Sequence, residues 1–597
     1  MLDLTFRSDN ILNKVLPPFF QCGSTGSGAV DSMRVKTADY VIIGGGTAGC
    51  VLAARLTEDP DVSVIVLEAG PHHRGLLIHM PAALGALYDK GAFHWPYVAD
   101  PEPHAADKTL PYKMGRIVGG SSAINGQVWA RGNPLDFDDW KASGCRGWEY
   151  GDLEPLFRRI EAFEDRSDSA MGHDGPIPVT RGKPENQPLS DAFLKAAKTA
   201  GYRINPNPNS GDQEGFCALH RNTRNGRRGD VYQGYIHPIR TRKNLTILPE
   251  HTVQKIEFDG KTAISVRTTH KGCDHRFIAR REIILAAGSI ASPQLLELSG
   301  IGAPEVLEDV GIPLVHALPG VGQNFHTHPT IAMTFTCSKP VSILNATRGI
   351  GKLIAGARWL LNRRGPAATT HFEAGAFLKS HPDADRPDYQ LTFLPLALAG
   401  TTGAVDQHGF QVYVELVGCQ SRGQVHIAST DINAQPRFRF NYLQDAQDVE
   451  IYKQAIATIR NVVAQQEFDA LLDRELVPGA TVTEDAEIEA WIRKCASFSH
   501  HLVGSCKMGP TRDPLAVVDP ELRVHGLRNI RVVDASIMPN VTSANTHAAT
   551  IVIAEKAAER WCQTNANQSL FFSNLNLLGC EETAPLGKSS GAVQLEK

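Results

Sequence analysis

Residues 39–70, DYVIIGGGTAGCVLAARLTEDPDVSVIVLEAG, constrain the fold more than any other stretch of the chain. A short apolar run, Tyr40–Ile43, leads into a glycine-rich turn, and a helix-like segment extends through Leu56. A second apolar run, Val62–Leu67, follows and stops on Glu68. Strand, glycine turn, helix, strand and terminal acid in this order predict the first unit of a nucleotide-binding parallel sheet.

The turn carries three glycines in the G-x-G-x-x-G spacing. Gly44 permits a tight turn, Gly46 lets the backbone approach a pyrophosphate, and Gly49 lets the helix pack on the sheet. The helix N-terminus stabilises phosphate charge, and Glu68 is placed to accept hydrogen bonds from a ribose diol. An acid at this position argues against a 2′-phosphate and leaves NAD and FAD both open. The candidate binding residues of this unit are Gly44, Gly46, Thr47, Ala48, Gly49, Glu68 and Ala69.

The composition is that of an ordinary soluble globular protein, with 42% hydrophobic and 21% charged residues. The 597 residues are enough for more than one domain. A formal net charge of -4 by itself gives no reason to expect nucleic acid or anionic lipid as a partner. No apolar run reaches the length of about 18 residues that a membrane-spanning helix needs, so no transmembrane segment is expected.

Both ends of the chain look like appendages. Residues 1–35 are interpreted as a flexible extension, because Ile11–Phe20 is broken by polar residues and prolines and lacks the basic start of a secretory signal. Met33 is an alternative start, and residues 563–597 are interpreted as a poorly ordered tail. Eleven cysteines without C-x-x-C spacing, in a chain without a signal peptide, predict reduced thiols and a cytoplasmic location.

The pattern changes between residues 330 and 510. The alternating segments Tyr389–Phe393, Phe410–Leu416 and Gly423–Ile427 predict an antiparallel sheet with one covered face, and the helical stretch Asp448–Gln465 flanks it. The predicted fold is α/β (α+β overall), a Rossmann-like nucleotide-binding domain with an inserted antiparallel-sheet domain that covers the ligand crevice. The predicted boundaries are 36–160, 225–330 and 511–562 for the nucleotide-binding domain, and 161–224 and 331–510 for the inserted substrate domain.

Three further blocks make a family resemblance specific. They are GRIVGGSSAIN (Gly115–Asn125), GSIASPQLLELSGIG (Gly288–Gly302), and the C-terminal run that begins with HLVGSCKMG at His501 and continues through VVDASIMP and NTHAATIVIAEKAA. With the glycine fingerprint, these blocks resemble the glucose–methanol–choline (GMC) oxidoreductases. The blocks occur in family order over residues 38–560. The resemblance implies an FAD-dependent alcohol dehydrogenase.

The resemblance also implies further cofactor-binding positions. Backbone N–H groups at 119–122 can face a phosphate or the polar edge of a flavin. Members whose flavin is covalently attached carry a histidine immediately before Asn125, where this chain has Ile124, so FAD is predicted to bind noncovalently. The implied residues are Arg116, Gly119, Gly120, Ser121, Asn125, Gly126, Val128, Val253, Ala287, Gly288, Asp534, Ala535, His547 and Thr550.

Alcohol oxidation removes a hydride from carbon and a proton from the hydroxyl, and near neutral pH a histidine is suited to take the proton. Among 22 histidines, His501 and His547 fall on the two family positions that face the flavin. The resemblance implies that His501 is the general base and that His547 binds the substrate oxygen, although the two roles could be shared or exchanged. His500 is interpreted as a packing residue beside them.

The histidine pairs at 72–73 and in His326-Thr327-His328 lack cysteine or carboxylate companions at ligand spacing, so no metal is predicted. The second pair lies in GVGQNFHTHP, which the resemblance identifies as a structural turn.

Substrate indications are fewer. The segments GPAATTHFEAGAFL, PDYQLTFLPLAL and HGFQVYVELVGCQSRGQVHIAS resemble bacterial choline dehydrogenases more than fungal sugar oxidases. Glu373 beside Phe372 is a candidate for binding a quaternary ammonium group through charge and cation–π contact, and a glutamate held in a turn is the alternative. A primary alcohol is favoured, with choline as one option.

Other readings stay open at this point. The electron acceptor could be a quinone, a carrier protein or oxygen; the last would make the protein an oxidase that produces hydrogen peroxide. The family also contains lyases and a photodecarboxylase, and histidine at position 547 counts against the decarboxylase. Peripheral association with the bacterial inner membrane would suit a quinone-linked enzyme, but no segment of the sequence demands it.

Overall fold

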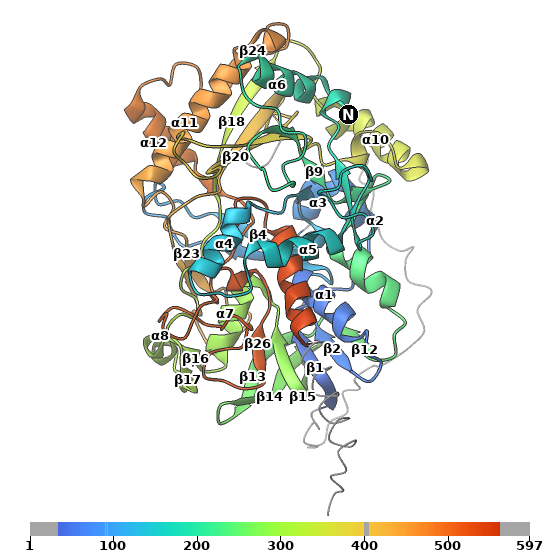
Figure 1. Cartoon of the computed structure of the whole chain (residues 1–597), viewed down its shortest axis with the longest axis vertical. Coiled ribbons are helices and arrows are strands. Elements are labelled where there is room, and N and C mark those ends of the chain that lie inside the picture. Colours follow the sequence, from blue (N-terminus) through green and yellow to red (C-terminus); the bar gives the residue numbers. More distant parts are fainter. Residues whose placement is uncertain (1–33, 90, 92, 399–404, 562–597) are drawn as a thin grey trace, which may run out of the picture.

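The structure is a computed structural model that describes residues 34–89, 91, 93–398 and 405–561. The predicted N-terminal extension, apart from its last residues, and the predicted C-terminal tail lie outside these ranges. Two large sheets organise the described chain, one at each end of the long axis in Figure 1. None of the helices in the described ranges combines the length and the apolar character that crossing a bilayer requires.

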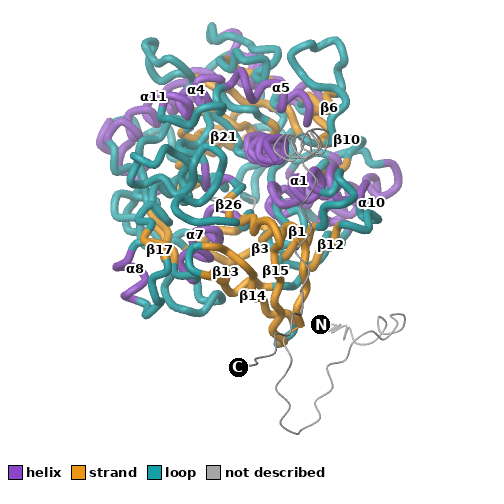
Figure 2. Tube along the Cα trace, turned by 60° about the horizontal axis from the view of Figure 1, so that its bottom comes forward, coloured by secondary structure: helices purple, strands orange, loops and turns teal. Residues whose placement is uncertain are grey.

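The first sheet contains the predicted glycine-turn unit. β1 is parallel to β2 on one side and to β15 on the other, while β12 and β26 extend the parallel part and β14 and β13 add an antiparallel edge. β2 is buried along its whole length, as expected of a parallel strand covered on both faces. Figure 2 shows β1 and β12–β15 gathered at one end of the molecule. The strands are β1 (Arg34–Ile43), β2 (Val64–Leu67), β12 (Leu245–Leu248), β13 (Thr252–Asp259), β14 (Thr262–His270), β15 (Cys273–Leu285) and β26 (Ile530–Val532), and the helices of this part include α1 (Thr47–Leu56) and α7 (Gly288–Leu298).

The second sheet is antiparallel, in the order β24-β18-β21-β20-β19-β8, with β25 paired to β18. One face packs on helices α6 and α11 in a core that includes Phe335, Phe393, Phe410 and Tyr452. The strands are β8 (Gly215–Ala218), β18 (Pro329–Cys337), β19 (Ala374–Leu378), β20 (Tyr389–Leu394), β21 (Gly409–Leu416), β24 (Leu472–Val477) and β25 (Ser497–Phe498), with α6 (Pro188–Thr199), α11 (Ala446–Val463) and α12 (Asp485–Cys495).

Two details differ from the sequence-based expectation. The polar side chains of β21, among them Gln411 and Glu415, face a large internal cavity and not solvent, so this sheet is covered on one face and enclosed on the other. An alternating pattern of polar and apolar residues shows which side chains share a face of the strand. It does not show whether that face meets solvent or an internal cavity. The segment Gly423–Ile427 forms β22 (Gln424–His426), which pairs with β23 (Arg437–Arg439) outside the large sheet.

The remaining helices and strands are mostly shorter, and α2, α3, α9, α10, β3, β4 and β5 contribute residues to the cavity wall. The helices are α2 (Leu76–His79), α3 (Leu84–Asp89), α4 (Pro134–Ala142), α5 (Tyr150–Ile160), α8 (Pro304–Asp309), α9 (Leu344–Thr347) and α10 (Gly349–Asn362). The strands are β3 (His94–Val98), β4 (Pro111–Gly115), β5 (Val128–Trp129), β6 (Glu161–Phe163), β7 (Ile177–Arg181), β9 (His220–Arg221), β10 (Thr223–Arg224), β11 (Arg227–Arg228), β16 (Ile301–Gly302) and β17 (His316–Ala317).

Candidate active site

A cavity of about 2280 Å³ extends between the two sheets. At one end it reaches the β1–α1 turn and the carboxyl end of β2, where an α/β sheet normally binds its ligand. At the other end its wall is the polar face of β18, β20 and β21. The volume exceeds the ~300–1,000 Å³ of a typical small-molecule site and suits a dinucleotide together with a small substrate.

The glycine turn has the backbone geometry that the spacing predicts. Gly44 has a φ of 103°, and a Cβ there would meet the carbonyl oxygen of Ala286 at 2.4 Å. A Cβ on Gly49 would lie 1.9 Å from the carbonyl oxygen of Gly44, so only glycine lets α1 pack this closely. A Cβ on Gly46, in contrast, would find no atom nearer than Gly120 Cα at 3.9 Å. The space in front of Gly46 therefore belongs to the cavity and fits a diphosphate.

Glu68 is held at the end of β2 by backbone donors. Its Oε2 accepts a hydrogen bond from Gly45 N at 2.9 Å, and its Oε1 accepts one from Gly70 N at 2.7 Å. Burial raises the pKa of this carboxyl to about 7. Glu68 lines the cavity, and each oxygen keeps a second lone pair that can accept from a ribose hydroxyl.

The second glycine-rich stretch closes on the first. Gly119 N donates to Gly45 O at 2.7 Å, and a Cβ on Gly120 would lie 2.7 Å from Gly46 Cα. Gly119 and Gly120 both have positive φ, 103° and 55°. Asn125 is fixed because its backbone oxygen and its Oδ1 each accept from Arg228 Nη1 at 2.7 Å. Two glycine stretches and the carboxyl of Glu68 thus form one cradle for a dinucleotide.

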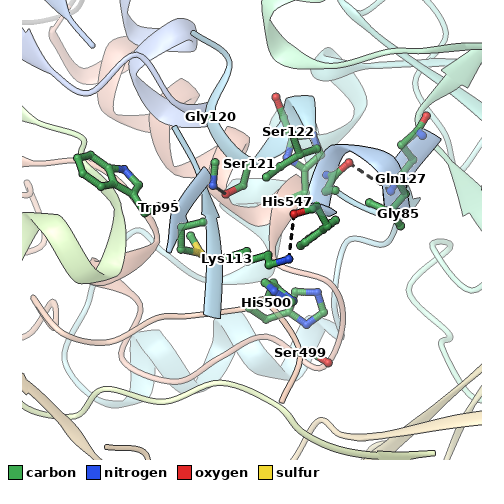
Figure 3. A pocket seen from close by; sticks show the side chains of 18 of the residues that line it. Gly85, Trp95, Lys113, Gly120, Ser121, Ser122, Gln127, Ser499, His500 and His547 are labelled. Carbon is green, nitrogen blue, oxygen red and sulfur yellow. Dashed lines mark hydrogen bonds between the residues drawn. The ribbon is translucent and has the colours of Figure 1, made fainter. Parts of the chain in front are cut away.

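Most of the predicted cofactor-binding residues line this one cavity: Gly44, Gly46, Thr47, Ala48, Glu68, Ala69, Gly120, Ser121, Asn125, Gly126, Val128, Val253, Ala287, Gly288, Asp534, Ala535, His547 and Thr550. Figure 3 shows Gly120, Ser121 and His547 on its wall, with Lys113 and His500 nearby. Gly49, Arg116 and Gly119 do not line it; the guanidinium of Arg116 lies 4.7 Å from the centre of the Trp95 ring.

His501 lies on the cavity wall within a chain of hydrogen bonds. Its Nδ1 is 3.0 Å from Nδ1 of His328, and its Nε2 is 2.9 Å from Nδ2 of Asn545. Nε2 of His328 is 3.0 Å from the carbonyl oxygen of Thr542. Burial lowers the pKa of His328 to about 4, so at neutral pH this ring carries only one proton.

These contacts determine the tautomer of His501. A carbonyl oxygen only accepts, so Nε2 of His328 donates to Thr542 and Nδ1 of His328 keeps its lone pair. Nδ1 of His501 must therefore carry the hydrogen of the His328–His501 bond, and Nε2 of His501 keeps a lone pair. Burial, with a smaller contribution from the His328 ring, holds the pKa of His501 well below its ordinary 6.5. The ring of His501 is therefore neutral, and its unprotonated Nε2 accepts a hydrogen bond from Asn545 Nδ2.

His547 lies on the same cavity wall. Its ring makes an edge contact with Trp129, with 5.9 Å between the ring centres. Burial lowers its pKa to about 4, and Nε2 has no hydrogen-bond partner among the described residues. This nitrogen is one of several buried polar side-chain atoms that no protein group satisfies in the described ranges.

The sequence-based reading did not assign roles to His328 and Asn545. Residues 324–328 were interpreted as a structural turn, but the bridge between His326 and Val503 brings this turn beside His501. The ring of His326 binds the backbone, because its Nε2 accepts a hydrogen bond from Val541 N at 3.0 Å. Only the spacing of His326 and His328 singled out this segment; a metal site there was considered and not predicted, and nothing in the spacing pointed to a contact with His501.

The predicted substrate residues separate into two groups. Phe372 lines the cavity, with its ring 6.4 Å from that of Tyr413. Glu373 does not line it: its carboxylate forms an ion pair with Arg221 and accepts from Lys183 N at 2.7 Å. On the β18–β21 side of the cavity, Glu415 lines the wall; its carboxyl accepts from the Ser499 hydroxyl, and burial raises its pKa.

His500 was interpreted as a packing residue, but in the structure it is exposed and lines the cavity. Its ring lies 4.7 Å from that of Tyr112 and 5.5 Å from that of Tyr88. Among residues 34–89, 91, 93–398 and 405–561, no group of three or more His, Cys, Asp or Glu side chains is arranged to hold a metal ion. His73 of the other histidine pair forms a 3.0 Å contact with Asp230 and stacks on Tyr232.

Known proteins resemble the chain over most of its length. An oxygen-dependent choline dehydrogenase of Chromohalobacter salexigens is 42% identical over 532 residues, which are 88% of this chain and 95% of that protein. An oxygen-dependent choline dehydrogenase of Ectopseudomonas mendocina is 43% identical over 87% of this chain and 93% of its own length. Among solved structures, pyridoxine 4-oxidase from Mesorbium loti superimposes with a TM-score of 0.80 at 31% identity and covers 88% of this chain and 99% of that one.

The model of the family described as GMC oxidoreductase matches in two parts, at residues 38–330 for its N-terminal domain and at residues 419–554 for its C-terminal domain. The first match contains the cradle, and the second contains His501 and His547. Members of this family are FAD-binding flavoproteins, and the cradle of this chain fits that cofactor. The chain belongs to the GMC oxidoreductase family, and it is an FAD-binding enzyme with the predicted Rossmann-like fold.

Proposed function

We propose that the protein oxidises a primary alcohol to an aldehyde, with His501 as the general base. FAD, held by the cradle, supplies the two-electron acceptor for this chemistry. Nε2 of His501 receives the hydroxyl proton, because the contacts with His328 and Asn545 leave it the unprotonated nitrogen. The single observation that carries the proposal is this neutral imidazole on the same cavity wall as His547.

His547 would hold the substrate oxygen. Its Nε2 is a buried polar atom without a protein partner among the described residues, and a substrate hydroxyl would satisfy it. Two imidazoles would then bracket one hydroxyl, one nitrogen receiving its proton and the other hydrogen-bonding its oxygen. The assignment of each role to one of the two rings is part of the proposal.

Another part of the cavity wall favours a substrate with a polar or cationic group. Tyr413 and Phe372 offer ring faces, and Glu415 offers a carboxyl that is hydrogen-bonded to Ser499. A cation beside Glu415 would stabilise its ionised form and would contact the rings by cation–π interaction. The similarity to choline dehydrogenases makes choline one candidate. Glu415 takes the place in this proposal that the sequence had suggested for Glu373.

An anaerobic screen of alcohols tests the proposed function. Choline and neutral primary alcohols are mixed with the holoenzyme, and loss of the flavin absorbance is recorded. Bleaching by an alcohol supports the proposal, whereas retention of the colour with every alcohol would favour a lyase or decarboxylase of the same family. Reoxidation of the bleached enzyme by a quinone, an electron-carrier protein, a dye or oxygen then identifies the acceptor and separates a dehydrogenase from an oxidase.

A further inference from the structure

Helix α10 (Gly349–Asn362) exposes its apolar side chains to solvent. The side chains of Ile350, Leu353, Ile354 and Leu361 are 77%, 72%, 61% and 87% exposed. Because a helix repeats every 3.6 residues, these positions lie along one stripe. Ala355 and Trp359 on the opposite face are buried against the segment that follows the helix. α10 is therefore amphipathic, but its larger apolar stripe faces outward.

The exposed stripe borders the mouth of the active-site cavity. Leu353 and Leu360 are exposed and also line the cavity, so α10 contributes to its rim. α2 lies on the same side of the molecule (Figure 1). Leu76 of α2 is 49% exposed, and the next residue, Leu77, lines the cavity. The apolar surface thus continues from solvent into the cavity along both helices.

Positive charge surrounds the stripe. Between Cys337 and Glu373 the sequence contains no Asp or Glu, and it contains the basic residues Lys339, Arg348, Lys352, Arg358, Arg363 and Arg364. Lys352, Arg358 and Arg364 are exposed. The neighbouring β10–β11 hairpin is tied to the helix because Trp359 Nε1 donates to Gly226 O at 2.6 Å, and it adds the exposed Arg227. Although the whole chain is slightly acidic, this face is cationic.

We propose that the outward face of α10 docks on the surface of a bilayer that contains anionic phospholipid. Apolar side chains on one stripe with Lys and Arg beside them are the composition of helices that lie in the bilayer interface. Anionic headgroups supply the charge that complements Arg358 and Arg364. Docking would open the cavity mouth at the lipid surface, so that apolar reactants could enter without crossing water. The docking itself does not depend on which reaction the cavity performs.

Sedimentation of the holoenzyme with lipid vesicles tests the proposal. The vesicles contain phosphatidylcholine alone, or phosphatidylcholine partly replaced by phosphatidylglycerol. The test variant is I350S/I354S/L361S, whose three positions do not line the cavity. The matched control is L314S/L515S, which removes exposed apolar side chains of 51% and 40% exposure at a distance from α10. Flavin content and dye reduction with a soluble acceptor verify that each variant is folded.

The parent and the control should sediment with the anionic vesicles and much less with phosphatidylcholine alone. The test variant should partition at least about tenfold more weakly. R358Q/R364Q should weaken the dependence on phosphatidylglycerol. Three results would overturn the proposal: no sedimentation of the parent, equal sedimentation of the test variant, or vesicle binding only after residues 1–32 are removed. A parent dimer that the test variant dissociates, without vesicle binding, would likewise assign this face to a second copy of the chain.

Discussion

The Nδ1 atoms of His328 and His501 lie 3.0 Å apart, and this contact decides which nitrogen of His501 is available as a base. Thr542 orients His328 from one side, and Asn545 meets His501 from the other. In the proposed mechanism His328 would be a positioning residue, because it contacts His501 and would act on the reaction through that ring.

Replacing His328 should therefore lower turnover, and the loss should depend on whether the new side chain can accept the hydrogen bond from His501 Nδ1. His328→Leu removes the acceptor for the His501 Nδ1 hydrogen and should reduce kcat by about tenfold or more. His328→Gln keeps a carbonyl oxygen as acceptor and should retain more activity. Steady-state kinetics over a range of pH would check this order. Equal losses in both variants would mean that His328 only fills space.

The proposed roles predict different losses at the two cavity histidines. His501→Ala should keep FAD bound and lower turnover by at least about a hundredfold, since general-base catalysis is lost. His547→Asn keeps a hydrogen-bond donor and should mainly raise KM. Stopped-flow flavin reduction would measure both effects. A His501→Ala enzyme with nearly the parent rate would remove the assignment of the base.

The depressed pKa of His501 predicts the pH profile. A group whose pKa is lowered stays unprotonated through neutral pH, so the rate of flavin reduction should be level there. The rate should fall only in acid, as His501 gains a proton at a pKa below 6.5. The rate of flavin reduction at saturating alcohol, measured against pH, would check this. A fall that begins above pH 6.5 would contradict the neutral base.

Gly46→Ala tests the cradle. The added methyl would meet no protein atom closer than 3.9 Å, so the fold should be retained, but the methyl would occupy space proposed for the diphosphate. FAD affinity should fall by about tenfold or more, which corresponds to about 1.4 kcal/mol. Flavin titration of the apoprotein gives the Kd, and circular dichroism verifies the fold. Unchanged affinity would place the diphosphate elsewhere. Gly49→Ala should instead damage the protein itself, since its Cβ would lie 1.9 Å from Gly44 O.

Glu373 and Glu415 should differ in what their substitution changes: stability for Glu373 and substrate binding for Glu415. Arg221→Met leaves Glu373 buried without its partner and should lower the free energy of unfolding by about 3–5 kcal/mol. The double variant R221M/E373Q should be less destabilised, which denaturant unfolding would show. Glu415→Gln should change KM for a cationic alcohol with little loss of stability. A large change in KM with Glu373→Gln, and none with Glu415→Gln, would reverse this assignment.

The first sheet was largely predictable because its signals are local. The apolar run before Gly44 and the acid that ends β2 are fixed by backbone geometry within one βαβ unit, and the fold class is confirmed. β1 nevertheless begins at Arg34, six residues before the apolar run, because pairing with β15 extends it.

The active site was predictable only where the family motif carries it. The family motif singles out His501 and His547, which both line the cavity, but the contact between His328 and His501 joins positions 173 residues apart and has no local signal. Glu373 and Glu415 illustrate the same limit. Both glutamates follow an aromatic residue closely in sequence. Glu373, however, is paired with the buried Arg221, and no sequence pattern predicts that ion pair.

The second sheet uses different residues for the cavity wall and for the hydrophobic core. On β21, Gln411, Tyr413 and Glu415 face the cavity, while Phe410, Val412 and Val414 belong to the hydrophobic core on the other side. Because successive side chains on a strand point in opposite directions, the cavity row can be rewritten without repacking the core. Such a wall gives natural selection a surface on which substrate preference can drift from one lineage to the next while the scaffold stays intact.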